Sequence, residues 1–266
     1  MTGAGNDFVV IDNRENFFAK RADLARRLCD RHWGVGGDGL LLLENAEGAA
    51  YRMEYYNADG SHGGMCGNGG RCIAAFAVER QIAPPVHSFE ALGDKYTASV
   101  AGEDVSLEMK DPRDIRLNVT LTVQGVNHAV HYVDTGAPHV VLIVEDVDAI
   151  GEVVPLGRAI RAHEVFRPSG TNVNFVQVTG SHALRIRTYE RGVEDETLAC
   201  GTGSVAAAVI GTLVLGLDRP IDVQVRSGAR LRVDFDRTSE SGIRRVVLRG
   251  PVKTVFRGEI DLQDVV

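Results

Sequence analysis

Most of the chain consists of short segments in which apolar and polar residues alternate, separated by turn residues. Alternation with a period of two over four to eight residues is the pattern of a half-buried β-strand. The sequence is therefore predicted to be rich in β-structure. Strands are predicted at residues 8–12, 40–44, 51–56, 96–100, 105–109, 119–123, 128–134, 140–144, 173–178, 183–189, 221–225, 231–235, 244–248 and 254–256.

Helical periodicity is confined to four segments. Apolar residues three and four positions apart predict helices over residues 21–31 and 156–163, and a third helix beginning near Gly69. A fourth helix is predicted to begin near Gly203 and to run through the apolar stretch 205–217. That stretch is too short to span a bilayer, so we interpret it as a buried core helix.

Two of the predicted helices begin alike, which indicates an internal duplication. Cys66-Gly67-Asn68-Gly69 precedes one helix and Cys200-Gly201-Thr202-Gly203 precedes another, and the cysteines lie 134 positions apart in a chain of 266 residues. Each loop follows a predicted strand and a polar turn. The duplication predicts two similar α+β halves, one covering residues 1–111 and 252–266 and the other residues 112–251.

Composition and charge exclude several classes of protein. Hydrophobic residues make up 44% of the chain and charged residues 24%, as in ordinary globular proteins. A net charge of -7 argues against a general nucleic-acid binder. No secretory signal pattern opens the chain, so we expect a cytoplasmic protein that spans no membrane. Its four cysteines are then expected to be thiols, with Cys29 and Cys72 in the core.

The two cysteine loops have the features of a reactive site. A helix N-terminus offers unpaired backbone N–H groups and a partial positive charge, and adjacent glycines allow a ligand to approach the backbone. Such an end binds carboxylates and favours the thiolate form of a neighbouring cysteine. A single loop of this kind, however, is also compatible with ordinary turn chemistry around a buried cysteine.

A pair of such loops in matching halves indicates a more specific chemistry. If the halves face each other, both sets of N–H groups can hold one carboxylate, with a sulfur on each side of the carbon that bears it. One thiolate then removes the α-proton, and the opposite thiol delivers a proton to the other face. This is the geometry of stereoinversion, and the amide donors stabilise the charge that develops on the carboxylate.

Five motifs, in order along the chain, resemble those of diaminopimelate epimerases. The first and third are Gly3-Ala4-Gly5-Asn6-Asp7-Phe8 and Gly170-Thr171-Asn172-Val173-Asn174-Phe175, and Tyr189-Glu190-Arg191-Gly192 is the fourth. The second and fifth contain the cysteine loops: Asn57-Ala58-Asp59-Gly60-Ser61 followed by residues 65–72, and residues 196–203. The chain is therefore identified as similar to this family over most of its length.

The resemblance implies a reaction, a fold and a set of site residues. The family converts LL-2,6-diaminopimelate to the meso form without pyridoxal phosphate or metal, and its members are expected to be homodimers. The implied fold is two pseudo-symmetric halves of mostly antiparallel or mixed β-sheet, each wrapped around a central helix, with the active site in the cleft between them. Cys66 and Cys200 are implied as the acid/base pair. The implied substrate-binding residues are Asn6, Asn57, Gly67, Asn68, Asn172, Glu190, Arg191, Gly201 and Thr202, with His139 and Glu190 as possible catalytic support.

The sequence departs from the family pattern at four places. Ala137 precedes Pro138-His139 where the family often has Asn, and Gly39 stands where some members carry a Gln that contacts substrate. Only five residues precede Asn6, and Phe256 occupies the position of a dimer-interface Tyr in some members. None of these changes affects the cysteine loops.

Three alternatives remain open from the sequence. A proline or hydroxyproline racemase or epimerase of the same fold would also carry paired cysteines, although its first loop usually has His at the position of Asn68. A cysteine hydrolase or acyl transferase would need a His base beside one thiol and would leave the second loop unexplained. A thiol redox or metal-binding protein is the non-enzyme alternative. The spacing of Cys66 and Cys72 is not that of a usual zinc knuckle.

Overall fold

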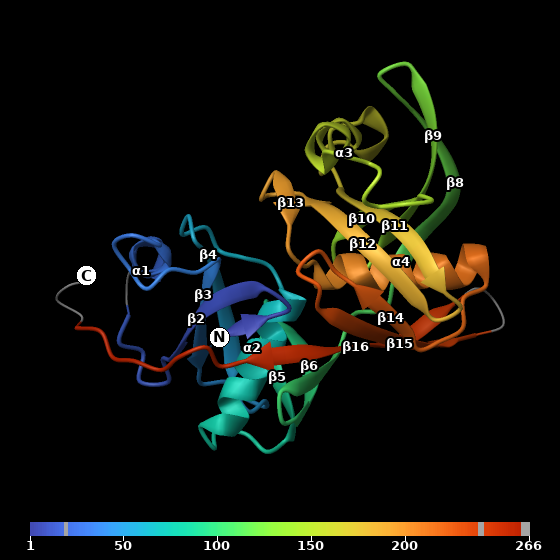
Figure 1. Cartoon of the computed structure of the whole chain (residues 1–266). Helices are drawn as coiled ribbons and strands as arrows, with labels where there is room; N and C mark the ends of the chain where they lie inside the picture. Colours follow the sequence, from blue (N-terminus) through green and yellow to red (C-terminus); the bar gives the residue numbers. More distant parts are fainter. Residues whose placement is uncertain (19–20, 239–241, 262–266) are drawn as a thin grey trace. The chain divides into compact units, whose positions relative to one another are not determined.

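The computed structural model describes residues 1–18, 21–238 and 242–261, and the chain divides into two compact units (Figure 1). Unit 1 is Met1–Glu108 together with the segment from Arg249 onward, and unit 2 is Met109–Leu248. The strand β16 (Ile243–Lys253) contributes its first residues to unit 2 and its last residues to unit 1.

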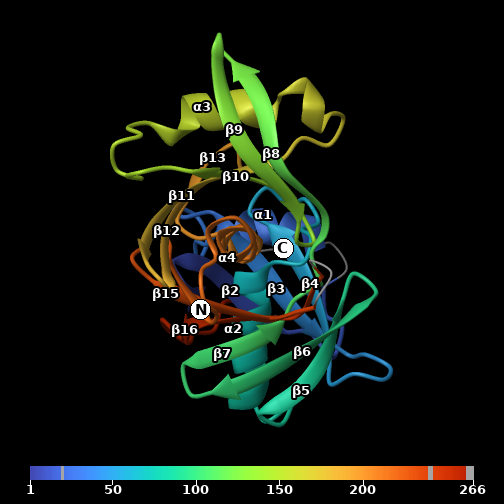
Figure 2. The ribbon, with the colours of Figure 1, turned by 90° about the vertical axis from the view of Figure 1, so that its right-hand side faces the viewer.

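The sheet of unit 1 closes on itself. Its strands follow the order β1 to β7 and then β16, and β1 also pairs with β16 through Thr2↔Lys253 and Gly3↔Val252. The strands are β1 (Thr2–Gly3), β2 (Asn6–Asp12), β3 (Gly39–Glu44), β4 (Arg52–Asn57), β5 (Val86–Ala91), β6 (Asp94–Ala101) and β7 (Asp104–Glu108). The helix α2 (Gly67–Glu79) contacts six of these strands and is the central helix of the unit (Figure 2).

A second helix, α1 (Arg21–Cys29), packs on the outer side of the β2–β4 region. Its buried positions Leu24, Ala25, Leu28 and Cys29 form a small core with Leu40 and Leu42 of β3. The helix connects β2 to its parallel neighbour β3, as a crossover connection between parallel strands requires.

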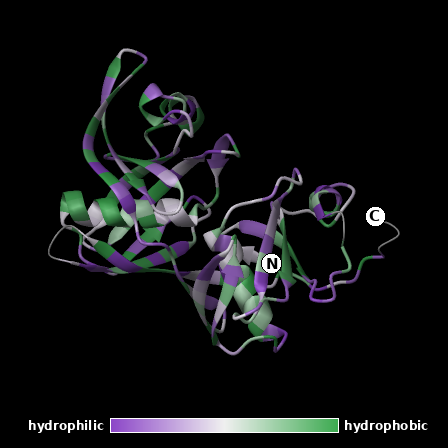
Figure 3. Ribbon diagram, turned by 180° about the vertical axis from the view of Figure 1, so that it is seen from behind, coloured by the Kyte–Doolittle hydropathy of each residue, from purple (hydrophilic) through white to green (hydrophobic). Residues whose placement is uncertain are grey.

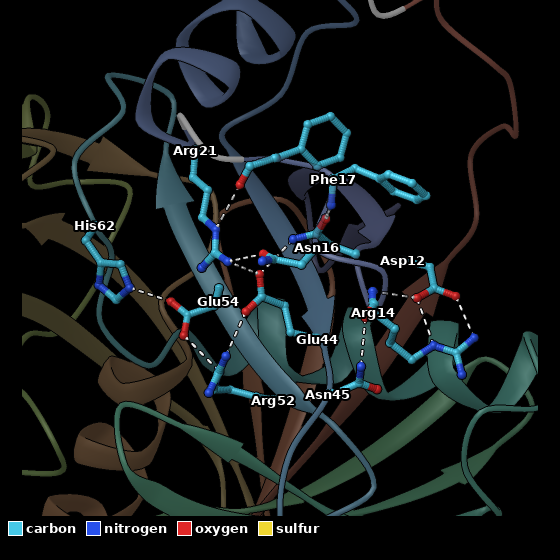
Figure 4. A network of polar contacts seen from close by, with 12 residues as sticks. Asp12, Arg14, Asn16, Phe17, Arg21, Glu44, Asn45, Arg52, Glu54 and His62 are labelled. Carbon is cyan, nitrogen blue, oxygen red and sulfur yellow. Dashed lines mark hydrogen bonds and ion pairs between the residues drawn. The ribbon is translucent and has the colours of Figure 1, made fainter.

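A buried carboxylate lies at the C-terminal end of β3. Glu44 is 3% exposed and accepts hydrogen bonds from Asn13 at 2.7 Å and Arg52 at 2.9 Å, and Arg21 lies 2.8 Å away (Figure 4). Arg52 also reaches Glu54 at 3.3 Å. A carboxylate is tolerated inside a protein only with such partners. The network therefore ties the chain before α1 to β3 and β4.

Unit 2 repeats the plan of unit 1. Its strand order is β16-β15-β14-β12-β11-β10-β9-β8, with β13 on β12. The strands are β8 (Arg113–Val123), β9 (Val126–Asp134), β10 (Pro138–Ile143), β11 (Asn172–Gly180), β12 (Ala183–Glu190), β13 (Asp195–Thr197), β14 (Ile221–Gln224) and β15 (Arg230–Arg237). The helix α4 (Gly201–Leu215) contacts β9, β10, β11, β12, β14 and β15.

The duplication is visible in the strand pairing. In unit 1, β2 and β3 are parallel across α1, β4 is antiparallel to β3, and β5 follows parallel to β4 across α2. In unit 2, β10 and β11 are parallel across α3 (Val153–Arg161), β12 is antiparallel to β11, and β14 follows parallel to β12 across α4. Each half is thus a mixed sheet around a central helix, as predicted.

The apolar stretch 205–217 forms most of α4. Its residues from Val205 to Ile210 are fully buried, and hydrophobic residues lie along much of the helix (Figure 3). An apolar residue on every face fits a helix that has strands around it. Across the described residues, no helix is both long and apolar enough to span a membrane.

Most predicted elements are present, and the errors have identifiable causes. The predicted strands 244–248 and 254–256 were wrong as separate elements, because β16 continues through Gly250 and Pro251 and ends at Lys253. Pro251 fits at an exposed position of the strand. The strands β1, β5 and β13 and the short 3₁₀ helix Glu164–Phe166 were missed, and all of them except β5 are only two or three residues long.

Candidate active site

Cys66 is the N-cap residue of α2, at the start of the central helix of unit 1. Its φ and ψ angles are −102° and 117°, and its sulfur accepts a hydrogen bond from the backbone N–H of Gly69 at 3.4 Å. A side chain at Gly69 would be tightly placed, because an added Cβ would lie 3.2 Å from Leu41 Cδ2 and the leucine would have to shift slightly. Cys66 is thus held at the N-terminus of α2 by the hydrogen bond from Gly69.

Cys200 has the same position on α4 in unit 2. Its φ and ψ angles are −120° and 114°, and its sulfur accepts a hydrogen bond from the N–H of Gly203, again at 3.4 Å. A Cβ on Gly203 would lie 2.5 Å from Asn174 Oδ1 and 3.3 Å from the Cys200 sulfur. Each unit thus presents a thiol at a helix N-terminus, where backbone amides and the helix dipole favour a negative charge.

Asn6 and Asn68 lie beside Cys66. The Cys66 thiol faces Asn6 Oδ1 at 3.8 Å, and Asn68 Nδ2 donates to the same oxygen at 3.3 Å. The orientation of the Asn6 amide is fixed from its other end, because Asn6 Nδ2 donates to Asp38 Oδ2 at 2.6 Å. Asp38 is in turn held by Arg31, which also pairs with Asp7.

A chain of hydrogen bonds leads from the core of unit 2 to Cys200. Asn174 Nδ2 donates to Val140 O at 2.8 Å and to His139 Nδ1 at 3.1 Å. Because Nδ1 accepts, Nε2 carries the ring proton and donates to the Thr202 hydroxyl oxygen at 2.9 Å. The Thr202 hydroxyl lies 3.5 Å from the Cys200 sulfur and has its own proton available to donate.

His139 is neutral in this chain. The residue is fully buried, and burial lowers the pKa of its imidazole to about 3, with Asp134 raising it and Arg191 lowering it by smaller amounts. A neutral imidazole with an accepting Nδ1 can only donate from Nε2. The ring therefore orients Thr202 and does not itself exchange protons near neutral pH.

The residues predicted to bind the substrate form two further groups. In unit 2, Asn172 Nδ2 donates to Pro138 O and its Oδ1 accepts the N–H of Arg191, both at 2.9 Å. Glu190 accepts from Thr197 Oγ1 at 2.9 Å. In unit 1, Asn57 ends β4 and its amide donates to Ser61 Oγ at 2.9 Å within a tight turn.

Gly39, one of the departures noted above, has a structural explanation. A Cβ at this position would lie 2.5 Å from Tyr55 Cε2 and 2.7 Å from the carbonyl oxygen of Tyr56. The tyrosine ring occupies the space that a longer side chain would need. A glutamine at position 39 would therefore require Tyr55 to move.

Sequence reasoning missed several residues around the two cysteines. Asn174 and Thr188 fix the orientation of His139, since Thr188 Oγ1 donates to Asn174 Oδ1 at 3.0 Å. Arg71 and Asp38 hold the side chains of Asn68 and Asn6. The sequence offered no clear signal for these residues, because Asn174 occupies a polar position of an alternating segment and Arg71 follows Gly69 and Gly70. Among the residues that the structure describes, no group of three His, Cys, Asp or Glu side chains could hold a metal ion.

Comparison with known proteins identifies the family. The family model for diaminopimelate epimerase matches residues 1–122 and 131–255. The chain is 46% identical to the diaminopimelate epimerase of Chlorobaculum tepidum, over 98% of this chain and 100% of that protein. The chain belongs to the diaminopimelate epimerase family. The family member from Aquifex aeolicus is 43% identical over 98% of this chain and 96% of its own length.

Several solved structures share the fold of this member of the diaminopimelate epimerase family. A PhzF-family phenazine biosynthesis protein from Bacillus anthracis superposes with a TM-score of 0.74 at 15% identity, over 94% of this chain and 92% of that chain. A probable proline racemase from Agrobacterium radiobacter gives a TM-score of 0.71 at 18% identity, over 98% and 91%. The predicted fold class is therefore confirmed.

Proposed function

We propose that the protein converts LL-2,6-diaminopimelate to the meso form, with Cys66 and Cys200 as the acid/base pair and without a cofactor. The observation that carries the proposal is the duplicated cysteine cap. In each unit a cysteine precedes the central helix, and its sulfur accepts a hydrogen bond at 3.4 Å from the backbone N–H three residues later. The extent of the similarity to the epimerases of the family supports the choice of substrate.

The chemistry requires one sulfur on each side of the substrate α-carbon. The thiolate of one cysteine removes the α-proton and becomes a thiol, and the thiol of the other delivers its proton to the opposite face and becomes a thiolate. The electron pair left by the α-proton spreads onto the adjacent carboxylate. Backbone N–H groups of Gly67, Asn68, Gly201 and Thr202 are proposed to stabilise that charge.

The far end of a diamino-dicarboxylate needs partners for one ammonium and one carboxylate. We assign Asn6, Asn57, Asn172, Glu190 and Arg191 to this task. The Asn172 amide has a protein partner at each end, and each end retains one further hydrogen-bonding position. Asn172 also fixes the backbone of Arg191, whose guanidinium can grip a carboxylate through two parallel hydrogen bonds.

His139 is assigned a supporting role through Thr202. The burial of the ring and its low pKa keep it neutral, so it serves as a fixed donor to the Thr202 hydroxyl beside Cys200. Glu190 is placed by Thr197 at the end of β12 and is assigned to the substrate ammonium. Neither residue transfers the α-proton in this proposal.

The reaction is tested by incubating the purified, metal-stripped protein with LL-diaminopimelate in heavy water without pyridoxal phosphate. Proton NMR follows the loss of the α-proton signal, and chiral separation follows the isomers. We expect exchange together with formation of the meso isomer, and loss of turnover in Cys66→Ala and Cys200→Ala. Exchange with proline or hydroxyproline, and none with diaminopimelate, would support the two-cysteine mechanism and contradict diaminopimelate as the substrate.

We also propose that the protein acts as a homodimer. Val255 and Phe256, which follow Thr254 after the end of β16, are 61% and 62% exposed and are adjacent apolar residues of unit 1. We propose that a second copy of this chain packs against these two side chains. Sedimentation equilibrium is expected to give a dimer for the native chain and a larger monomer fraction for Phe256→Glu. A monomeric native chain contradicts this assignment.

A further inference from the structure

The loop before Cys66 folds back along β4. His62 lies four residues before the cysteine and pairs with Tyr56 in an antiparallel bridge. Its imidazole packs edge-on against the Tyr56 ring, with ring centroids 5.1 Å apart, and its Nε2 donates to Glu54 Oε2 at 2.8 Å (Figure 4). Arg52 is a second cation beside this carboxylate, at 3.3 Å. A side-chain contact therefore attaches the loop to β4 shortly before Cys66.

The loop before Cys200 has the equivalent contact in unit 2. Glu196 lies four residues before the cysteine, in β13, and pairs with Tyr189 of β12 in the antiparallel ladder. Its carboxylate accepts two hydrogen bonds from Arg187, from Nε at 2.7 Å and from Nη2 at 2.8 Å, and Arg226 Nη1 lies 2.8 Å away. The Glu196 side chain is 5% exposed, so this carboxylate is buried between two arginines.

The two contacts occupy the same position in the duplicated plan. In each unit the loop residue stands opposite a tyrosine one position before the end of the strand, and its side chain reaches diagonally to the residue two positions earlier. The strand then ends at a residue proposed to bind the substrate, Asn57 in unit 1 and Glu190 in unit 2. The polarity is exchanged, because the carboxylate is on the strand in unit 1 and in the loop in unit 2. Both halves thus have this contact, although they share neither its residues nor its polarity.

Each of these loops connects two groups that are proposed to act on the substrate. Residues 58–65 connect Asn57 to Cys66, and residues 191–199 connect Glu190 to Cys200. A connecting segment of this kind has low local stability unless its own contacts hold it. Proton transfer requires a defined distance from the sulfur to the α-carbon, and a displacement of about 1 Å can lower the rate roughly 100-fold. A side chain that joins the loop to the strand can therefore affect catalysis without touching the substrate.

We propose that His62 and Glu196 are positioning residues, each of which holds the loop before one cysteine against the strand whose last residue binds the substrate. Each contact fixes the sulfur of its own unit relative to that strand end. Neither side chain touches the substrate or transfers a proton in this assignment. The inference rests on the proposed acid/base function of the two cysteines.

Amide hydrogen–deuterium exchange of the full-length protein without substrate, followed by peptide mass spectrometry, measures the two loops directly. We expect His62→Ala to accelerate exchange at least about tenfold in residues 58–66 and to leave residues 191–200 as in the native protein. Glu196→Ala should have the reverse effect, because each side chain holds the loop of its own unit. Asp222→Asn is the matched control, since it breaks an ion pair with Arg232 that joins β14 to β15 at 2.7 Å. Both loops should exchange in this control as in the native protein.

Steady-state kinetics with diaminopimelate separate positioning from binding. In His62→Ala and in Glu196→Ala we expect kcat to fall roughly 10- to 100-fold while KM stays within about threefold of the native value. The reason is that the residue at the strand end keeps its place when the loop is released. The Asp222→Asn control should keep the native kcat and KM.

The arrangement in unit 2 supplies a rescue variant for unit 1. Glu54→Arg combined with His62→Glu copies to unit 1 a loop carboxylate between two arginines, with Arg52 as the second. Glu54→Arg alone places a cation beside His62 and Arg52, and His62→Glu alone places a second carboxylate beside Glu54, so each single change should act like His62→Ala. The double variant should exchange like the native protein in residues 58–66 and recover kcat to within about threefold.

Either of two results would overturn the inference. The first is native-like exchange of the affected loop in a folded alanine variant. The second is a double variant that is no better than its two single variants, which would show a general structural role. The His62 side chain is 43% exposed, so the unit 1 variants carry the test if Glu196→Ala does not fold. Because exchange is measured without substrate, its failure is distinct from a failure of the heavy-water assay.

Discussion

His139 Nε2 lies 2.9 Å from the Thr202 hydroxyl oxygen, and that hydroxyl lies 3.5 Å from the Cys200 sulfur. The histidine is fully buried, and the amide of Asn174 fixes which ring nitrogen carries the proton. A proton donor of fixed orientation therefore faces one of the two proposed acid/base groups. It reaches the sulfur through side chains from β10, β11 and the N-terminus of α4.

Removing the Thr202 hydroxyl is expected to lower kcat. Thr202→Val keeps the shape of the side chain but leaves the buried Nε2–H of His139 without its acceptor and removes a donor beside Cys200. A hydrogen bond to a charged group contributes about 1.5–3 kcal/mol, so losing the hydroxyl that donates to the charged sulfur of Cys200 during proton transfer is expected to lower kcat roughly 10- to 100-fold. Steady-state kinetics test this, and Thr202→Ser should recover most of the activity. Equal losses in the two variants would contradict a role for the hydroxyl.

The neutral state of His139 predicts an acid-sensitive fold. Its pKa is about 3 in the folded protein, below the ordinary value of 6.5, so at intermediate pH the unfolded chain binds the additional proton. Stability is therefore fully present above about pH 6.5 and is lost as the pH falls toward 3. At pH 5 the loss from this one residue is about 2 kcal/mol. Urea unfolding at pH 7 and pH 5 measures it.

A matched variant isolates the contribution of that histidine. His87 and His131 are also buried, and burial lowers the pKa of each, so some pH dependence remains without His139. His139→Gln should reduce the difference in stability between pH 7 and pH 5 by most of the 2 kcal/mol given above. An unchanged difference in the variant would show that the ring titrates alike in the folded and unfolded chains.

Gly203 is expected to tolerate no side chain. In Gly203→Ala the new methyl group would lie 2.5 Å from Asn174 Oδ1 and 3.3 Å from the Cys200 sulfur, so it would push on both the histidine chain and the cap. Overpacking of this kind costs about 1–3 kcal/mol. We expect a lower Tm and a strongly reduced kcat. Gly180→Ala is the control, because its methyl group would meet only Ala183 Cβ at 3.7 Å, and its Tm and kcat should stay near those of the native protein.

The network around Glu44 should contribute to stability and leave catalysis unaffected. Glu44→Ala would leave Arg21 and Arg52 without their shared carboxylate and Asn13 without its acceptor. The two arginines are 24% and 45% exposed, so water compensates part of the loss, and about 2 kcal/mol of the free energy of unfolding is expected to be lost. Urea denaturation measures the change. A large fall in kcat with unchanged stability would contradict this assignment.

Sequence patterns predicted the elements that carry strong periodicity and the two loops that carry chemistry. The stretch from Val205 to Ile210 identified the central helix of unit 2, and the repeated Cys-Gly-x-Gly starts identified both caps. Elements such as β1 and β13 could not be predicted, because two- or three-residue strands are defined by their partners and carry no periodicity.

The side chains that support the two cysteines were beyond sequence reasoning for a different reason. Asn174 and Thr188 act through contacts with residues far away in the sequence, and a polar residue within a strand does not reveal its partner. Arg71 contacts Asn68 only three residues away, but the sequence does not show that its side chain is buried. The assignment of Cys29 and Cys72 to the core was correct, since both are buried. Their apolar surroundings on α1 and α2 were sufficient for that prediction.

The strand β16 gives the two units different positions in the order of synthesis. Unit 2 has all of its own strands once residue 248 has been made, whereas the sheet of unit 1 lacks its closing strand until residues 249–253 follow. A chain emerging from the ribosome thus completes the second unit before the first. The half that contains Cys66 must wait for the half that contains Cys200, although it is translated earlier.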